Sequence, residues 1–347
     1  MNEKVLHTLE YNKILDQLTE YAFSADAKSR CQKLRPITDR AQIEQLQQQT
    51  SDALSRLFKY GSLSFSGVTD IRDSLKRLEI GGALSAIELL RVCSLLESAK
   101  RAKAFARSQN DSDQPDDSLT SLFAGIEPLT PLGDEIRRCI LSEDEIADDA
   151  SSTLRSIRKS MRGMNDKIRA QMNSMINNTT TRSYLQDTVI TMRDGRYCLP
   201  VKAEAKSLVP GMIHDQSSTG STFFIEPAAV VSLNNQLREL EIEEQKEIAV
   251  ILANLSAEAG AHTLEIAENQ RIMTQLDFIF AKASLAMDQN ASRPLFNDEH
   301  IVRIRQGRHP LLDRKKVVPI DVELGKNFDL LVITGPNTGG KTVCLKT

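Results

Sequence analysis

Near its end the chain reads Leu330-Leu331-Val332-Ile333-Thr334-Gly335-Pro336-Asn337-Thr338-Gly339-Gly340-Lys341-Thr342. From Gly335 onward the spacing is G-x-x-x-x-G-K-[ST], which is typical of a loop whose backbone N–H groups surround a phosphate chain. The apolar run at 330–333 predicts a buried parallel strand, and the residues after Lys341 can begin a helix whose N-terminus favours an anion. The stretch therefore predicts the start of a nucleotide-binding α/β unit.

The loop also predicts particular chemical roles. Lys341 is placed to reach the terminal phosphates, and the Thr342 hydroxyl is placed to ligate Mg²⁺. The alternative is a glycine turn that fits the spacing by chance. A nucleotide-binding domain needs on the order of 100 to 200 residues, so we expect its acidic strand for Mg²⁺ beyond Thr347. We therefore expect the N-terminal part of a longer protein, which does not turn over ATP by itself.

Composition sets broad limits on the function. The 347 residues are 40% hydrophobic and 26% charged, which suits two or three globular units. Since there is no run of about 18 apolar residues and no signal peptide, we expect a soluble, cytoplasmic protein. The five cysteines form no C-x-x-C pair and predict reduced core thiols, and the five histidines are scattered, which argues against a metal cluster. Trp is absent, so base stacking is not expected to dominate binding.

Charge is distributed unevenly along the chain. The formal net charge of −3 excludes a generally polybasic protein, so nucleic-acid binding requires a local positive face. One basic segment runs from Arg155 to Arg182 with Asp166 as its only acid, and Glu239–Glu247 is strongly acidic. Two interpretations stay open. Either the two segments are helix faces that pair with each other, or the basic segment contacts nucleic acid.

The first part of the chain has helical periodicity. The expected helices cover residues 5–18, a segment that Ser24 or Asp26 caps and that ends before Pro36, about 39–59, about 70–78, and a segment that begins at Ser85. These are signals of a helical bundle. The run Ser108–Ser118 has almost no apolar content and predicts a mobile surface loop.

Two long helical segments follow. From about Glu143 to Asn178 the chain lacks proline and repeats leucine, isoleucine and methionine every three or four residues, which predicts a coiled-coil seam. A matching stripe returns after Pro227 and continues to about Met287. We expect two antiparallel arms, with the methionines packed in the seam rather than forming an adaptable binding surface.

Between these segments the period changes to two. Thr188–Met192 and Arg196–Val201 flank the turn Arg193-Asp194-Gly195, which predicts a β-hairpin, and further strands are expected over 209–214 and 221–225. A small sheet at the tips of two arms suggests a clamp. Its candidate phosphate contacts, with ordinary surface charges as the alternative, are Arg193, Arg196, Lys202 and Lys206. His214 beside Asp215 is expected to be structural, because no nucleophile or metal set accompanies it.

The expected fold is mainly α, with a small antiparallel β clamp and the beginning of an α/β P-loop domain. The domains that we expect are a helical core or lever domain at 1–142, an ascending clamp arm at 143–187, a β clamp tip at 188–226, a returning arm and core helix at 227–290, and the start of a P-loop ATPase domain at 291–347.

In this order of parts the chain resembles the MutS family of ATPases. The family motifs are Gln306-Gly-Arg-His-Pro-Leu-Leu312 and the loop 333–342. Three further segments look closer to one bacterial branch, the second MutS paralogue called endonuclease MutS-two, and these are Gly195-Arg-Tyr-Cys-Leu-Pro-Val-Lys202, Ile213–Pro227 and Leu233-Asn-Asn-Gln-Leu237. The resemblance covers essentially the whole chain.

The resemblance implies a dimeric ATPase with ATP sites completed across the dimer, a C-terminal nuclease domain and no mismatch-reading domain. It implies action on branched DNA to suppress recombination, or on collided ribosomes and their rRNA, which are sensed and split. The cofactors would be ATP and Mg²⁺. The residues that it places on nucleotide phosphates or metal are Gly335, Asn337, Gly339, Gly340, Lys341 and Thr342, with Val317 or Val318 near the base. Thr342 stands where the family usually has Ser, and it keeps the hydroxyl for the metal.

Two other classes of protein stay open. One is a chromosome-structuring ATPase of the SMC or Rad-fifty kind, in which the phosphate loop lies ahead of the arms rather than after them. The other is a non-catalytic helical interaction module in which the loop binds nothing. Titrating ATP–Mg²⁺ into an extended chain and its Lys341→Ala variant separates nucleotide binding from this last class.

Overall fold

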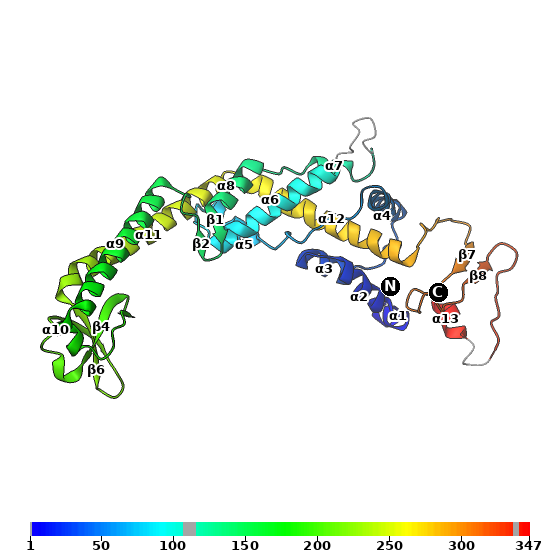
Figure 1. The fold of residues 1–347 in the computed structure, drawn as a ribbon. Helices are drawn as coiled ribbons and strands as arrows, with labels where there is room; N and C mark the ends of the chain where they lie inside the picture. The colour runs from blue at the N-terminus through cyan, green and yellow to red at the C-terminus, as the bar shows by residue number, and fades with distance from the viewer. Residues whose placement is uncertain (1, 107–115, 336–339) are drawn as a thin grey trace. The chain divides into compact units, whose positions relative to one another are not determined.

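The computed structural model describes residues 2–106, 116–335 and 340–347. Most of the polar run expected to be a mobile loop, 108–115, lies outside the described residues. The described chain is mainly α-helical with small antiparallel sheets, as expected (Figure 1). It forms two compact units. The first unit contains Met1–Lys76, Arg91–Gly133 and His262–Thr347, and the second contains Arg77–Leu90 and Asp134–Ala261.

The first unit is built mostly from helices. Its elements are α1 (Glu3–Thr8), α2 (Tyr11–Tyr21), α3 (Ala25–Gln32), α4 (Arg40–Tyr60), α7 (Thr120–Ala124), α12 (Thr263–Gln289), β7 (Val302–Gly307), β8 (Ile320–Leu324) and α13 (Lys341–Lys346). Three helices have residues in both units, namely α5 (Arg72–Glu79), α6 (Ala86–Ala106) and α8 (Thr130–Cys139).

Side-chain caps set where two of these helices begin. Ser24 accepts a hydrogen bond from the Ala27 N–H at the start of α3, and Asp39 accepts one from the Gln42 N–H at the start of α4. Ser24 is one of the two caps that the sequence offered for α3, and α4 begins close to the expected position 39. The single helix expected over 5–18 is wrong, because Glu10 adopts a left-handed conformation (φ 57°) and separates α1 from α2.

The core of the first unit forms around α12, which packs against α2, α3 and α4. Four phenylalanine rings contact one another there, at positions 65, 105, 123 and 280. The Asp277 carboxylate on α12 is 1% exposed and accepts hydrogen bonds from Phe23 N–H and from the N–H and Oγ–H of Ser24. These bonds attach the turn before α3 to α12.

The end of the polar run is ordered by a buried ion pair. Arg56 on α4 is 2% exposed and makes two parallel bonds to Asp117, Nε to Oδ2 at 2.8 Å and Nη2 to Oδ1 at 2.9 Å. Ser118 donates through Oγ–H to Asp52 at 2.6 Å. The prediction of a mobile loop is therefore wrong at 117–118, because these polar side chains bind partners instead of water.

The second unit contains a long antiparallel helix pair that carries a small sheet at one end (Figure 1). Its further elements are β1 (Ile140–Ser142), β2 (Glu145–Ile146), α9 (Ser152–Asn177), α10 (Thr179–Tyr184), β3 (Thr191–Arg193), β4 (Arg196–Lys202), the short 3₁₀ helix η2 (Ala203–Ala205), β5 (Gly211–Gln216), β6 (Thr222–Pro227) and α11 (Ala228–Gly260).

The interface between α9 and α11 contains the methionine seam. Ile168 and Met172 are fully buried, and Met161, Met164 and Met175 pack against the same cluster, which includes Leu237 of α11. Core packing, the predicted role of these methionines, is confirmed. The predicted helix start at about Glu143 is wrong, because β1 and β2 form a hairpin there and Ser151 caps the helix by accepting from the Leu154 N–H.

The four-stranded sheet at the end of this helix pair has the order β3-β4-β6-β5 and is antiparallel throughout. Asp194 (φ 49°) and Gly195 (φ 72°) form the turn between β3 and β4, as the Asp-Gly pair predicted. Leu199 and Val201 of β4 and Ile225 of β6 face the helices and are at most 1% exposed. All four expected strands are present, with shifted ends.

The apolar run before the phosphate loop does not form the predicted strand. Leu330 is 78% exposed and Val332 is 71% exposed, and no described strand pairs with residues 330–333. A parallel strand is stable only when neighbouring strands satisfy its backbone and helices cover its faces. Because the described residues offer it neither, this prediction is not met.

Three smaller expectations concern cysteines, metals and membranes. Cys31, Cys93, Cys139 and Cys198 are buried free thiols, whereas Cys344 is only partly covered. The described residues contain no group of His, Cys, Asp or Glu side chains that is arranged to hold a metal ion. Within the described ranges, none of the helices has the length and apolar character needed to span a membrane.

Candidate functional site

Three of the four predicted phosphate contacts lie on one face of the sheet. Arg193 pairs with Arg196 across β3 and β4, and Arg196 and Lys202 are separated by an even number of positions along β4. Cross-strand partners and alternate residues share a face, so their side chains project from the same side. Lys206 follows η2, and its Nζ lies 5.0 Å from the centroid of Phe223, which pairs with Val201 on the other face.

Two of these cations are already held by carboxylates of the tip. Arg193 Nε lies 3.0 Å from Asp215 Oδ2, and the guanidinium stacks 3.9 Å from the centroid of Phe224. Arg196 Nη1 lies 3.0 Å from Glu226 Oε1. Lys202 donates to the Ser183 carbonyl oxygen at 3.1 Å. The structure therefore brings the predicted residues near one another, but ion pairs and hydrogen bonds within the tip already engage Arg193, Arg196 and Lys202.

Glu226 is the centre of this polar network. It is 0% exposed, and it accepts hydrogen bonds from Arg196, from Asn234 Nδ2 at 2.8 Å and from His214 Nε2 at 2.5 Å. Burial by itself raises the pKa of Glu226, but the bonds from Asn234, His214 and Arg196 prevail and hold this pKa below its ordinary value of 4.5. His214 has the structural role that the sequence predicted.

A more exposed row of cations lies on α9, within the basic segment 155–182 that the sequence left open as a contact to nucleic acid. Four of its basic residues recur at i, i+4, i+7 and i+14, so they share one face of the helix over about 21 Å. All four are exposed, and we call them the α9 stripe: Arg155, Lys159, Arg162 and Arg169. Asp166 lies on the same face. Helical-wheel arithmetic on the predicted helix would have found this row.

The α9 stripe is distinct from the cations that face α11. Arg158 turns toward α11, where its Nε lies 2.7 Å from Glu244 Oε1, so the predicted pairing of the two helices is confirmed for this residue. Within the stripe, Arg155 and Arg162 approach Asp149 (3.7 Å) and Asp148 (3.1 Å). No ion pair of the described residues involves Lys159 or Arg169.

The described part of the phosphate loop is a short helix start. Gly335 (φ 140°) and Gly340 (φ 81°) adopt backbone conformations that favour glycine, and Lys341 and Thr342 are the first residues of α13. Asn337 and Gly339 lie outside the described residues. An ammonium, a hydroxyl and the unpaired N–H groups of a helix start are the donor set that a phosphate with Mg²⁺ requires, so these residues fit the implied group.

Comparison with known proteins finds close relatives over the whole chain. An endonuclease MutS2 from Agathobacter rectalis is 62% identical over 347 residues, and those from Lachnoclostridium phytofermentans and Lachnospira eligens are each 53% identical. The chain belongs to the MutS2 branch of the MutS family. The resemblance inferred from the loop, the tip and the motif at 306–312 is thereby confirmed.

The MutS2 relatives are longer than this chain. The chain is covered completely in each comparison, yet it spans only 43% to 44% of the relatives' length. No protein-family model matches it. The relatives' name includes an endonuclease activity, which is a property of those proteins.

Proposed function

We propose that the intact protein is an ATP-dependent MutS-type clamp that acts on nucleic-acid-containing partners. In this proposal the second unit is the clamp, with α9 and α11 as coiled-coil arms and the four-stranded sheet as its tip. The observation that carries the proposal is the α9 stripe, an exposed row of four cations on an arm of a MutS2-family chain. Exposed cations at this spacing suit contacts to successive phosphates, which bind without reading sequence.

The tip has a secondary role in this proposal. Arg193 and Lys206 lie beside aromatic rings and are partly or fully exposed, so they remain candidate contacts to nucleic acid. Arg196 and Lys202 are engaged inside the tip and are weaker candidates. A phosphate can compete with Asp215 for Arg193, because that ion pair is solvent-exposed and therefore contributes little.

The nucleotide part of the proposal rests on the loop. Gly335, Asn337, Gly339, Gly340, Lys341 and Thr342 would hold the phosphates of ATP, with the Thr342 hydroxyl as a ligand of Mg²⁺. ATP held by these residues would favour one clamp conformation by binding it more tightly than the other. We also propose the homodimer and the C-terminal nuclease that are typical of the family. The proposed domains of this chain are the helical core at 1–142, the ascending arm at 143–187, the β tip at 188–226, the returning arm and core helix at 227–290 and the start of the ATPase domain at 291–347.

The partner of the proposed clamp is branched DNA, with ribosomal RNA as the alternative. A row of phosphate-binding cations suits either polymer, since both present a regular phosphate backbone. Action on branched DNA would suppress recombination, and action on collided ribosomes would split them. Comparing the affinity for a four-way DNA junction with that for ribosomal subunits decides between the two.

Removing the α9 stripe is expected to weaken nucleic-acid binding and its salt dependence together. In the variant Arg155→Gln, Lys159→Gln, Arg162→Gln, Arg169→Gln, the affinity of the 347-residue chain for a four-way DNA junction should fall at least about tenfold at 0.1 M salt. The slope of log K against log salt should become less steep by about 3 to 4, because each lost phosphate contact removes about 0.9. Fluorescence anisotropy over a range of salt concentrations measures both quantities.

A matched variant controls for the loss of four charges. Lys28, Lys59, Lys76 and Lys100 are exposed cations that do not belong to the second unit. Changing these four to Gln should leave the slope within about one unit of the unchanged chain. The proposal fails if both quadruple variants lose affinity equally, or if the stripe variant keeps the original slope.

A further inference from the structure

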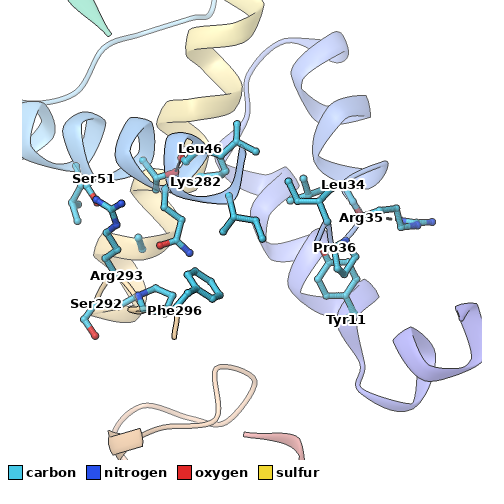
Figure 2. A pocket seen from close by; sticks show the side chains of 18 residues that line it. Tyr11, Leu34, Arg35, Pro36, Leu46, Ser51, Lys282, Ser292, Arg293 and Phe296 are labelled. Atoms are coloured by element: carbon cyan, nitrogen blue, oxygen red, sulfur yellow. Dashed lines mark hydrogen bonds between the residues drawn. The ribbon is translucent and has the colours of Figure 1, made fainter. Parts of the chain in front are cut away.

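Two neighbouring hollows in the first unit differ in their lining, because one is mainly apolar and the other is basic. The first is a pocket of about 490 Å³ between α2, α4, the end of α12 and the segment after it (Figure 2). Its walls are mainly aliphatic and aromatic, as Tyr11, Ile43, Leu46 and Phe296 illustrate. The size and the apolar lining are those of a pocket for a small organic ligand.

The second hollow is wider and basic. It has a volume of about 780 Å³ and shares Leu46 and Lys282 with the first. Arg30, Lys33, Arg35 and Arg72 also line it, against a single acid, Asp26. Arg72 pairs with Asp26 and Asp70, and Arg35 lies 3.4 Å from Glu3, whereas the ion pairs of the described residues do not include Arg30 or Lys33. The hollow therefore has an excess of positive charge.

Lys282 stands in the wall between the two hollows. Its ammonium lies 4.9 Å from the centroid of Phe278, and no carboxylate of the described residues lies within ion-pair distance of it. Burial lowers the pKa of Lys282 to about 8, and Cys31 acts in the opposite direction. A desolvated ammonium without a counter-ion is costly, and an anion bound beside it would offset that cost.

Ligand classes fit these hollows unequally. A sugar or a polar peptide would leave its hydrogen-bonding groups unpaired against Ile43, Leu46 and Phe296. A bare phosphate would leave the apolar pocket unused. We propose that the two hollows form one binding site for an amphipathic organic anion, whose apolar body occupies the first hollow and whose anionic group lies at Lys282.

The site is independent of the nucleic-acid contacts proposed for α9, because it lies wholly in the first unit. Leu34, Arg35 and Pro36 form one side in Figure 2, and Lys282 and Arg293 form another. Arg293 is held by Gln48 Oε1 and the Glu44 carbonyl oxygen, so it shapes the rim. Arg35 lines both hollows too but lies 3.4 Å from Glu3, so Lys282 is the cation between the hollows for which the described residues offer no ion pair.

Titration calorimetry with decanoate tests this proposal on the 347-residue chain. Decanoate combines an apolar chain with one carboxylate, decanol keeps the chain without charge, decyltrimethylammonium reverses the charge, and acetate keeps the charge without the chain. Decanoate is expected to bind at least about tenfold more tightly than the other three ligands. Decanol and decyltrimethylammonium lose the charge-assisted bond to Lys282, and acetate loses the apolar contact.

Variants locate the binding. Lys282→Met should bring the affinity for decanoate down to that for decanol, and Ser51→Trp, which fills the first hollow, should abolish binding of both. Lys59 lies on α4, as Ser51 does, but it lines neither hollow. Lys59→Met should therefore leave the affinities for all the ligands unchanged. If Lys282→Met is not folded, Lys282→Gln takes its place. Equal affinity of the unchanged chain for decanoate and decyltrimethylammonium, or full decanoate affinity in both Lys282 variants, overturns the proposal.

Discussion

Replacing Glu226 by alanine is expected to destabilise the β tip by about 3 kcal/mol, the lower end of the cost of breaking a buried ion pair. The substitution leaves Arg196, His214 and Asn234 without their common acceptor. Arg196 is 26% exposed and can turn to water, which limits the cost. Amide hydrogen exchange in β4 and β6 should accelerate by roughly 100-fold, since each 1.4 kcal/mol corresponds to about a factor of ten.

The same carboxylate gives the tip a predictable pH dependence. Because the pKa of Glu226 in the folded chain lies below its ordinary value of 4.5, its ionised form stabilises the tip above that value. This stabilisation is lost as the pH falls below about 4.5 and through the folded-state pKa. Protection factors of β4 and β6 should therefore fall more between pH 5 and pH 3.5 in the unchanged chain than in Glu226→Gln.

An exposed glutamate provides the matched control for both measurements. Glu204 lies in the same unit and is exposed, so Glu204→Ala should change the free energy of opening by no more than about 0.5 kcal/mol. Equal acceleration in Glu204→Ala and Glu226→Ala would show that the network around Glu226 contributes no particular stability.

Replacing Asp117 by alanine is expected to destabilise the first unit by about 4 kcal/mol, because it leaves a buried guanidinium without its counter-ion. Arg56 is 2% exposed, lies 4.8 Å from the centroid of Phe123, and already has one nitrogen, Nη1, without a partner in the described chain. Within the described chain its side chain is therefore almost fully shielded from water. Hydrogen exchange in α4 and α7 reports the loss as faster opening of both helices.

A double variant distinguishes a broken pair from a lost contact. Arg56→Met with Asp117→Ala removes the buried charge as well as its partner, so it should be more stable than Asp117→Ala alone. If the double variant is destabilised, relative to the unchanged chain, by the sum of the two single effects, the two side chains do not act as a pair. Burial alone raises the pKa of Asp117, and the bonds from Arg56 and from the Leu119 N–H hold it below its usual value.

Local signals predicted much of the fold, because their causes lie within a few residues. Ser24 and Asp39 cap helices through side-chain bonds to nearby N–H groups, and Asp194-Gly195 forms the hairpin turn. Polar composition was misleading at Asp117, since its partner Arg56 lies 61 residues away. The start of α9 was also missed, because Ser151 is one of several possible caps after Glu143.

The candidate site was only partly accessible from the sequence. Helical spacing alone predicts that the residues of the α9 stripe share one face. The contact of Arg158 with Glu244 was needed to show which cations of α9 face α11 and which face solvent. The internal pairing of Arg196 with Glu226 depends on strand register, which periodicity does not fix. The hollows beside Lys282 bring together Tyr11, Ile43 and Phe296, whose proximity no local pattern encodes.

In the proposed clamp, ATP bound at Lys341 changes the affinity of the α9 stripe for nucleic acid. The decisive measurement is the dissociation constant of a four-way DNA junction, with and without ATP–Mg²⁺, for a protein of the full length of the MutS2 relatives, of which this chain spans 43% to 44%. ATP should change this constant by at least about fivefold, the lower end of typical coupling between sites. Lys341→Ala should abolish the change, and the stripe variant should weaken binding with and without ATP. An equal ATP effect in Lys341→Ala, or none in the unchanged protein, would show that ATP at Lys341 does not control nucleic-acid binding.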